Sequence, residues 1–252
     1  MSHDNVNNLI RLNKAIAATG FCSRRKADEY IFSGCVFVNN IIETNPARHI
    51  RFERDVISVD GKTLEKPHKF TCILLHKPVH VVCTLNDPQG RPTIIDILPK
   101  KYKQIRLYPV GRLDYFSEGL LLLTNDGQLA QRLMHPRYHQ PKTYEVLVRG
   151  NVSEKKLMTI RNGMHLTDGD DVDPLEVEAT ALPSGNTQLR MVLCQGLNRQ
   201  IRRMCRDLGL IILRLRRIAQ GILRLGDLPY GSVRPLTPME YLDLRKSVNL
   251  SH

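Results

Sequence analysis

Hydrophobic residues near the start of the chain recur at intervals of three and four, the spacing that places side chains on one face of an α-helix. Two such stretches predict two short helices, which end near Gly20 and Gly34, and Ser23 is a typical N-cap for the second. The hydrophobic positions are Leu9, Leu12 and Ile16 in the first helix and Ala27, Tyr30 and Ile31 in the second.

The pattern then changes to the short alternating stretches that are typical of β-strands. An Asn-Asn pair follows the stretch at 36–38, and an Asp-Gly pair follows the stretch at 56–59. Both dipeptides favour tight turns, so two short hairpins are predicted. A proline among polar residues then interrupts the pattern in EKPHKF, residues 65–70. We place a domain boundary in this segment and expect a small N-terminal α/β domain over residues 9–66.

Beyond this boundary, strand-like and helix-like segments follow one another. CILLHKP, GLLLLT, TYEVLVRG and LRMVLCQG have the hydrophobic character of strands, whereas QLAQRLM and RQIRRMCRDLG have helical spacing. This mixture is typical of an α+β fold. We expect a mixed, largely antiparallel β-sheet flanked by helices over residues 70–245.

The composition adds a strong positive charge to this picture. The 252 residues include 37 Lys and Arg against 25 Asp and Glu, for a formal charge of +12. A surplus of this size favours a polyanionic partner such as nucleic acid, although a merely soluble basic protein is the simpler interpretation. No stretch approaches the roughly 20 apolar residues that span a bilayer, and MSHDNVNNLI lacks the layout of a signal peptide. We expect a cytoplasmic monomer without membrane contact.

Basic residues gather at two places. Arg24, Arg25 and Lys26 stand at the start of the second predicted helix, where side chains and free amides can face phosphates, or where the helix end is simply solvated. The second place, NRQIRRMCRDLGLIILRLRR, holds seven arginines and the single acid Asp207. A helix over 199–208 separates two faces. Arg199, Arg202, Arg203 and Arg206 form the face expected to meet anions, and Ile201, Met204, Cys205 and Leu208 form the face expected to meet a core.

Asp114 occupies a Gly-Arg-Leu-Asp turn just ahead of a run of four leucines. A turn aspartate that bonds its own backbone is the ordinary interpretation, and spacing alone favours nothing more specific. Common catalytic motifs are absent: Tyr115 stands where a serine-hydrolase elbow needs glycine, and neither nucleotide-binding glycine motif occurs. The histidines show no metal-ligand spacing, and the six cysteines form no C-x-x-C pair. We expect no metal ion and no cofactor.

The acidic stretch DGDDVDPLEVE, residues 168–178, invites comparison with a calcium loop. An EF-hand loop needs glycine at its sixth position, where this stretch has Asp173. A solvated loop that leads into a strand is therefore expected.

Three ordered motifs resemble those of the RsuA-type ribosomal RNA pseudouridine synthases, the branch that includes RluB and RluF. They are GRLDYFSEGLLLLTNDG (111–127), KTYEVLV (142–148) and GLNRQIRRMCRDLG (196–209). The stretch at 11–40 resembles the small RNA-binding domain of the S-four type that precedes the catalytic domain in this branch. LLHKP, GRPTIIDILP and GDLPYGSVRPLT match as well, so the similarity covers residues 9 to about 240.

This resemblance implies an enzyme that isomerises uridine to pseudouridine without a cofactor. It makes Asp114 the catalytic aspartate, which either attacks the anomeric carbon or assists base departure and sugar deprotonation. Arg202 pairs with Asp114, since a nearby cation keeps a carboxylate charged. Tyr144 stacks on the detached uracil, and Arg112 aids in flipping the nucleotide out of its helix. The remaining predicted RNA contacts are Arg24, Arg25, Lys26, Arg199 and Arg203.

Two features of this chain depart from the resemblance. His76 replaces a customary asparagine, and Tyr115-Phe116 are bulkier than usual, so both places are candidates for RNA contact. The predicted substrate is 23S ribosomal RNA of the large subunit, free or in an assembly intermediate. The 16S RNA of the small subunit stays an alternative, as does a catalytically silent ribosome-assembly protein. A helix-turn-helix DNA-binding regulator would leave most of the chain unexplained.

Overall fold

The computed structural model describes residues 9–65, 70–138 and 140–250. The chain divides into two compact units, residues 1–70 and 71–252. Residues 1–8, which hold most of the segment examined for a signal peptide, lie outside the described residues, as do 66–69 in the predicted boundary and His139. No helix among the described residues is long and apolar enough to cross a membrane.

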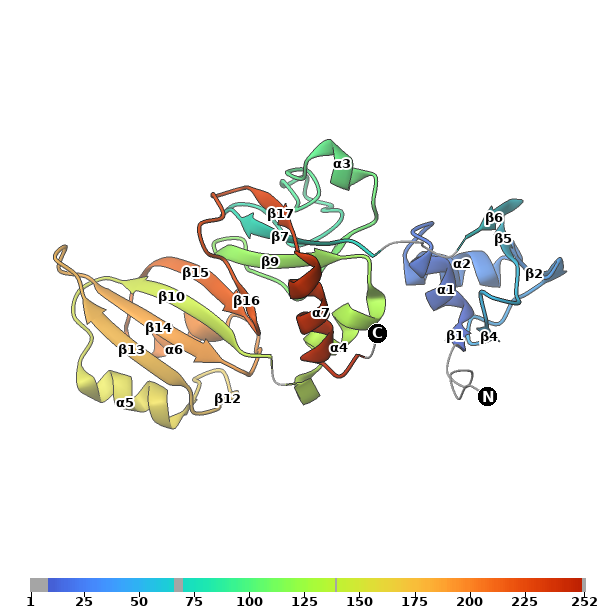
Figure 1. Ribbon diagram of the computed structural model, residues 1–252. Coiled ribbons are helices and arrows are strands. Elements are labelled where there is room, and N and C mark those ends of the chain that lie inside the picture. The colour runs from blue at the N-terminus through green and yellow to red at the C-terminus, as the bar shows by residue number, and fades with distance from the viewer. Residues whose placement is uncertain (1–8, 66–69, 139, 251–252) are drawn as a thin grey trace. The chain divides into compact units, whose positions relative to one another are not determined.

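The first unit packs two helices on small antiparallel sheets (Figure 1). Within its described residues, four strands pair in the order β3-β2-β5-β6, and β1 pairs with β4. The elements are β1 (Ile10–Arg11), α1 (Leu12–Ala18), α2 (Arg24–Phe32), β2 (Val36–Val38), β3 (Ile41–Ile42), β4 (His49–Ile50), β5 (Ile57–Val59) and β6 (Lys62–Leu64). Leu12, Ile16, Ala27 and Ile31 are buried in one core with Val36, Val38 and Val59.

Most local predictions for this unit are confirmed. The Ser23 side chain accepts a hydrogen bond from Lys26 N, as an N-cap does. Both hairpin turns have two successive residues with positive φ: Asn39-Asn40 at 54° and 64°, and Asp60-Gly61 at 48° and 74°. Leu9 was assigned wrongly, since it precedes the strand β1 and its side chain is 53% exposed.

The second unit is built on a nine-stranded sheet, counted within its described residues. The main order is β13-β14-β10-β15-β9-β7-β17, with β16 paired to β15 and β8 to β9. Its strands are β7 (Cys72–Lys77), β8 (Tyr108–Pro109), β9 (Glu118–Thr124), β10 (Lys142–Val148), β13 (Glu176–Ala181), β14 (Thr187–Leu193), β15 (Ile212–Gln220), β16 (Leu223–Arg224) and β17 (Val233–Pro235). Neighbours pair antiparallel except β15 and β9, which run parallel. The expected α+β class with a mixed sheet is confirmed.

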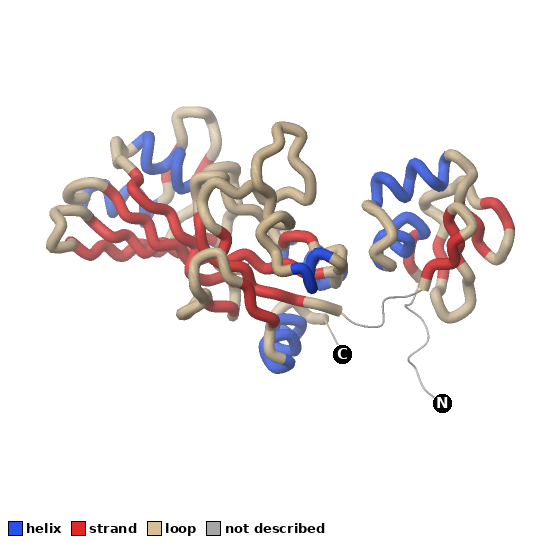
Figure 2. The backbone as a smooth tube through the Cα atoms, turned by 90° about the horizontal axis from the view of Figure 1, so that it is seen from above, coloured by secondary structure: helices blue, strands red, loops and turns tan. Residues whose placement is uncertain are grey.

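Helices pack on both faces of this sheet, and in Figure 2 they lie above and below the band of strands. The helices are α3 (Lys100–Lys103), α4 (Gly127–Met134), α5 (Glu154–Asn162), α6 (Gln200–Asp207) and α7 (Pro238–Lys246), with a 3-10 turn at Pro136–Tyr138 and a small hairpin of β11 (Met164–His165) and β12 (Asp171–Val172). Helices α5 and α6 pack on β10, β13, β14 and β15, whereas α4 and α7 pack on β7 and β9.

The leucine run forms the strand β9, which is buried on both of its faces. Leu120 and Leu122 pack with the α4 and α7 core, whereas Leu121 and Leu123 pack with the core that contains α3. Successive strand residues point to opposite faces, so four consecutive leucines suit a strand between two cores. The turn that carries Asp114 is thereby attached to one of the most buried strands of the unit.

Gly119 allows the two halves of the sheet to join. It lies at the parallel contact of β9 with β15, opposite Arg217. Its φ is +112°, and a Cβ atom there would lie 2.2 Å from Arg217 O. Only glycine tolerates both conditions.

Candidate active site

A cleft of about 890 Å³ opens in the second unit. Its lining brings together Asp114, Tyr144 and Arg202, which lie far apart in the sequence. Arg112 and Arg199 also line it, whereas Arg203 does not. The residues come from the turn before β9, from β10, from the loop before α6 and from α6 itself.

The Asp114 carboxylate faces two arginines of the α6 region. Asp114 Oδ2 lies 3.4 Å from Arg202 Nε and 4.0 Å from Arg199 Nη1. The contact with Arg202 is an ion pair without hydrogen-bond alignment, because Arg202 Nε has no hydrogen-bond partner among the described residues. The Asp114 side chain is 27% exposed. Its carboxylate is therefore held by charge but stays open to a substrate.

Arg202 is fixed to the same turn that carries Asp114. Its Nη2 donates to Phe116 O at 2.7 Å and to Ser117 Oγ at 3.0 Å. Burial lowers the pKa of Arg202 below its usual value, and the attraction of Asp114 partly offsets this effect. Arginine nonetheless stays charged in proteins, so Arg202 supplies a fixed cation beside the carboxylate.

Lys77 holds the turn that carries Asp114 through hydrogen bonds to backbone carbonyl groups. Its ammonium is fully buried and donates to Pro78 O at 2.8 Å, to Ser117 O at 2.8 Å and to Asp114 O at 3.2 Å. Ser117 N donates to Asp114 O at 3.0 Å and closes the turn. Burial lowers the pKa of Lys77 to about 8. Sequence reasoning assigned no role to Lys77, although it lies in the LLHKP segment that supported the resemblance.

Tyr144 lies on β10 with its ring against the cleft. It is half-buried and packs against the cores on both sides of the junction. Its register partner on β15 is Arg217. A half-buried ring with one open face is suited to stacking on a planar base.

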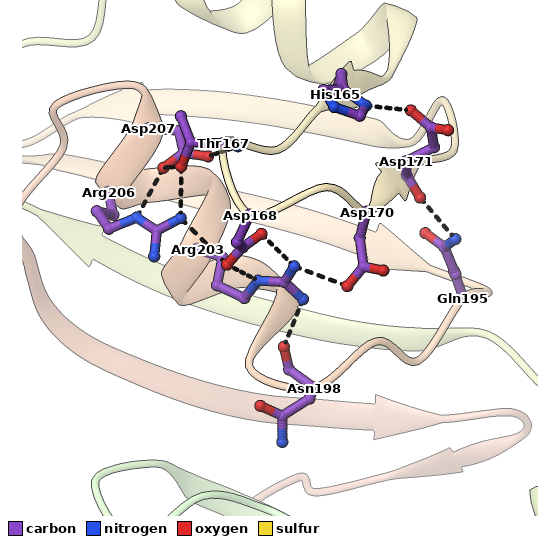
Figure 3. A network of polar contacts seen from close by, with 10 residues as sticks. All are labelled: His165, Thr167, Asp168, Asp170, Asp171, Gln195, Asn198, Arg203, Arg206 and Asp207. Carbon is purple, nitrogen blue, oxygen red and sulfur yellow. Dashed lines mark hydrogen bonds and ion pairs between the residues drawn. The ribbon is translucent and has the colours of Figure 1, made fainter.

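Arg203, predicted to contact RNA, has intramolecular partners (Figure 3). It bonds Asp168 and Asp170, the latter at 2.7 Å, and its side chain is 13% exposed. Arg206 bonds Asp207 at 2.7 Å, and Asp207 in turn accepts from Thr167 N at 2.9 Å. These contacts fasten α6 to the loop between β11 and β12. The RNA contact of Arg203 stays a prediction.

The same network corrects the interpretation of the acidic stretch. Its loop is exposed and leads into β12 and β13, as expected. Two of its acids, however, are the partners of Arg203, which the prediction of a simply solvated loop missed. The face of α6 predicted to meet anions thus meets the protein's own carboxylates at Arg203 and Arg206. The opposite face is confirmed as core, because Ile201, Met204 and Cys205 are buried.

The N-terminal basic cluster lies on exposed positions of α2. Arg24 and Arg25 are exposed and have no ion-pair partner among the described residues. Lys26 bonds Glu29 Oε2 at 2.7 Å, and this hydrogen bond raises the pKa of Lys26. Arg24 and Arg25 are therefore the members of this cluster that are available to a phosphate.

The two departures from the resemblance have different surroundings. His76 is 5% exposed, and its Nδ1 lies 2.8 Å from Leu228 O, so little of its side chain reaches the surface, and its contact with RNA stays a prediction. Tyr115 lines the cleft, and Phe116 is 56% exposed. Both rings pack against His80, with centroids 5.2 and 5.6 Å away. This aromatic group is open to a nucleotide.

Comparisons with known proteins identify the family to which this fold and its two units belong. Residues 71–207 match the family model described as RNA pseudouridylate synthase, and residues 10–57 match the S4 domain. The chain is 38% identical to the ribosomal large subunit pseudouridine synthase B of Bacillus subtilis, over 93% of this chain and 95% of that protein. It is also 38% identical to an uncharacterized RNA pseudouridine synthase of Aquifex aeolicus, over 96% of each. A crystal structure of a pseudouridylate synthase superposes with a TM-score of 0.66 at 29% identity, covering 93% of this chain and 99% of the other.

The fold and these matches define an RNA-modifying isomerase with an RNA-binding module. The chain belongs to the RNA pseudouridine synthase family. The resemblance seen in the sequence motifs is thereby confirmed.

Proposed function

We propose that this enzyme converts a uridine of 23S ribosomal RNA into pseudouridine and that Asp114 is its catalytic carboxylate. The observation that carries the proposal is the ion pair of Asp114 with Arg202, 3.4 Å apart, in a cleft that also contains the Tyr144 ring. The choice of large-subunit RNA is supported by two relatives, the ribosomal large subunit pseudouridine synthases B of Bacillus subtilis and Pseudomonas aeruginosa, which are 38% and 36% identical to this chain.

The reaction needs an ionised carboxylate near the sugar. The bond from the anomeric carbon to the base N1 breaks, a bond to the base C5 forms, and the proton on C5 is replaced by one on N1. Asp114 either attacks the anomeric carbon or removes a sugar proton as the base departs. Both routes require the charged form of Asp114, and the Arg202 cation lies 3.4 Å from its carboxylate. All groups in this proposal belong to the chain, so it includes no cofactor.

The other predicted residues receive roles from their positions. Tyr144 stacks on the detached uracil while the base turns. Arg112, exposed at the rim of the cleft, supports the flipped nucleotide. Arg199 neutralises an RNA phosphate near Asp114. Arg24 and Arg25, which belong to the first unit, bind other phosphates of the RNA.

Tritium release tests the proposal. Protein-free 23S RNA labelled at C5 of uridine is incubated with purified protein, and released tritium is counted. We expect release by the unmodified protein and none by Asp114→Asn, because the amide can neither attack nor accept a proton. Asp227→Asn is the matched control, since Asp227 is exposed and does not line the cleft. An active Asp114→Asn would contradict the mechanism, release from 16S RNA alone would contradict the substrate, and no release from any ribosomal RNA would favour a silent assembly protein.

A further inference from the structure

Two buried polar side chains in the wall of the cleft each have an atom without a hydrogen-bond partner among the described residues. Arg217 and Gln220 lie on β15, line the cleft and are 1% and 3% exposed. Arg217 Nε donates to Leu120 O at 2.8 Å, but its Nη2 has no hydrogen-bond partner among the described residues. Gln220 Oε1 likewise has none within the described part of the chain. The mechanism proposed for Asp114, Arg202 and Tyr144 gives neither residue a role.

An irregular register brings both side chains to one face. Tyr144 pairs with Arg217 and Lys142 pairs with Gln220, so Ile218 is an extra residue on β15. Side chains three positions apart on a regular strand point to opposite faces, and a bulge of one residue cancels this difference. Arg217 and Gln220 therefore share the cleft face with Tyr144 and Lys142.

Their burial without partners is costly unless a ligand completes them. A buried donor or acceptor without a hydrogen bond loses the solvation that it has in water. No carboxylate of the described residues forms an ion pair with Arg217. Burial lowers the pKa of Lys142, and the charge of Arg217 lowers it further. An apolar wall of the same shape would be more stable, so these groups indicate a function that uses them.

Their chemistry matches the pairing edge of uracil. This edge presents a carbonyl, an N3–H and a second carbonyl, that is, an acceptor, a donor and an acceptor. A glutamine amide offers an acceptor and donors side by side, and arginine offers donors alone. Cytosine lacks the N3 proton and carries an amino group in place of one carbonyl, so it would set donors against the guanidinium. Phosphate offers acceptors only and would leave Gln220 Oε1 unpaired.

We propose that Gln220 and Arg217 select uracil over cytosine: the Gln220 amide oxygen accepts from N3–H, the Gln220 amide nitrogen donates to the C2 carbonyl, and the Arg217 guanidinium donates to the C4 carbonyl, which cytosine replaces with an amino group. Tyr144 lies beside Arg217 in the register and covers the face of the same base. This inference rests on the proposed function, because the base that Gln220 and Arg217 bind is the uracil that Asp114 helps to detach.

A cycle of base and side-chain changes tests the selection. The modified position is first mapped in RNA treated with the protein, and two oligonucleotides are made with uridine or N3-methyluridine there. We expect the unmodified protein to lose roughly 100-fold or more in kcat/KM on N3-methylation, since a site built for a hydrogen bond rejects an analogue without it. Gln220→Leu is expected to lose about 10- to 100-fold on uridine but less than about threefold further on N3-methylation.

Control variants separate selection from folding. Gln188→Leu makes the same change in the same sheet at a residue that does not line the cleft, and it should keep the full methylation penalty. Arg217→Met removes the guanidinium, and Arg217→Lys, which keeps a donor cation, replaces it if that variant fails to fold. Arg216→Met is the control for Arg217→Met, since Arg216 is the neighbouring residue and pairs with Glu145. Equal methylation penalties for Gln220→Leu and the unmodified protein would overturn the inference while leaving the proposed function intact. Absence of tritium release from every ribosomal RNA would instead defeat the proposed function.

Discussion

Helix α6 contributes arginines to two clusters that contain the same kinds of group and behave differently. In the cluster of Figure 3, Arg203 and Arg206 meet three acids through aligned hydrogen bonds on an exposed surface. In the cleft, Arg202 meets one acid, Asp114, at 3.4 Å without such alignment. Satisfied charges fasten a helix, whereas an incompletely satisfied carboxylate keeps the capacity to react.

The two clusters also differ in their ratio of acidic to basic groups. Arg203 and Arg206 face three carboxylates, those of Asp168, Asp170 and Asp207, so their cluster has no excess of cations. Around Asp114 lie Arg202, Arg199 and the buried Lys77, three cations for one acid. An excess of cations in a site stabilises negative charge that develops on a departing base. Proximity of arginine to aspartate is thus not enough to identify a catalytic pair.

The largest expected effect comes from removing one arginine from each cluster. Arg202→Met should lower kcat by about 10²–10³-fold, the usual cost of a preorganised charge in an active site. Arg206→Met removes an exposed pair and should keep kcat within about threefold, with a small loss of thermal stability. Tritium release and thermal unfolding of both variants provide the comparison. Similar kcat losses in the two variants would mean that α6 acts as a single structural unit.

The junction behind the cleft gives the next largest effect. Gly119→Ala places a Cβ atom against Arg217 O at a φ of +112°, and we expect destabilisation of about 3 kcal/mol or more. Gly150→Ala is the matched control, because Gly150 has a φ of +74° with no atom near its Cβ position, and it should cost only about 1–2 kcal/mol. Urea unfolding measures both. Equal costs would show that β9 and β15 can separate without loss.

Sequence patterns predicted those parts of the fold that are decided locally. The Ser23 cap, both hairpin turns and the leucine strand depend on a few neighbouring residues, and all have the expected form. Leu9 was misassigned because the pairing of Ile10 with Ile50, forty residues away, places the chain in a strand before the helix begins. Tertiary pairing here overrides helical spacing.

The site was predictable only where its residues lie in motifs. Asp114, Tyr144 and Arg202 were assigned by resemblance, and the structure gathers them in one cleft. Arg203 was predicted to share the anion-facing side of the helix with Arg202, and only the fold brings Asp168 and Asp170 to it. The roles of Arg217 and Gln220 depend on one extra residue in the register of β15, which no hydrophobic pattern records.

Acid should weaken the satisfied cluster in a defined window of pH. The hydrogen bonds from Arg206 and Thr167 lower the pKa of Asp207 from 3.8 to about 2. A carboxyl whose folded pKa is depressed stabilises the protein above its unfolded pKa and loses this contribution as pH falls through the folded value. The thermal stability difference between the unmodified protein and Asp207→Asn should therefore be constant above about pH 4 and disappear toward pH 2. A difference that is independent of pH across this range would contradict the ion-pair interpretation.

The smallest effect concerns Arg24 and Arg25 of the first unit, which, unlike Arg203 and Arg206, have no ion-pair partner among the described residues. Each phosphate neutralised on a single strand contributes about 0.7 to the slope of log binding constant against log salt. Replacing Arg24 and Arg25 by alanine should therefore reduce this slope by about 1.4 for RNA binding. Arg190→Ala is the control, because Arg190 already pairs with Glu178 at 3.6 Å and should leave the slope unchanged. An unchanged slope in the double variant would mean that exposed arginines without partners are not, by themselves, contacts for RNA.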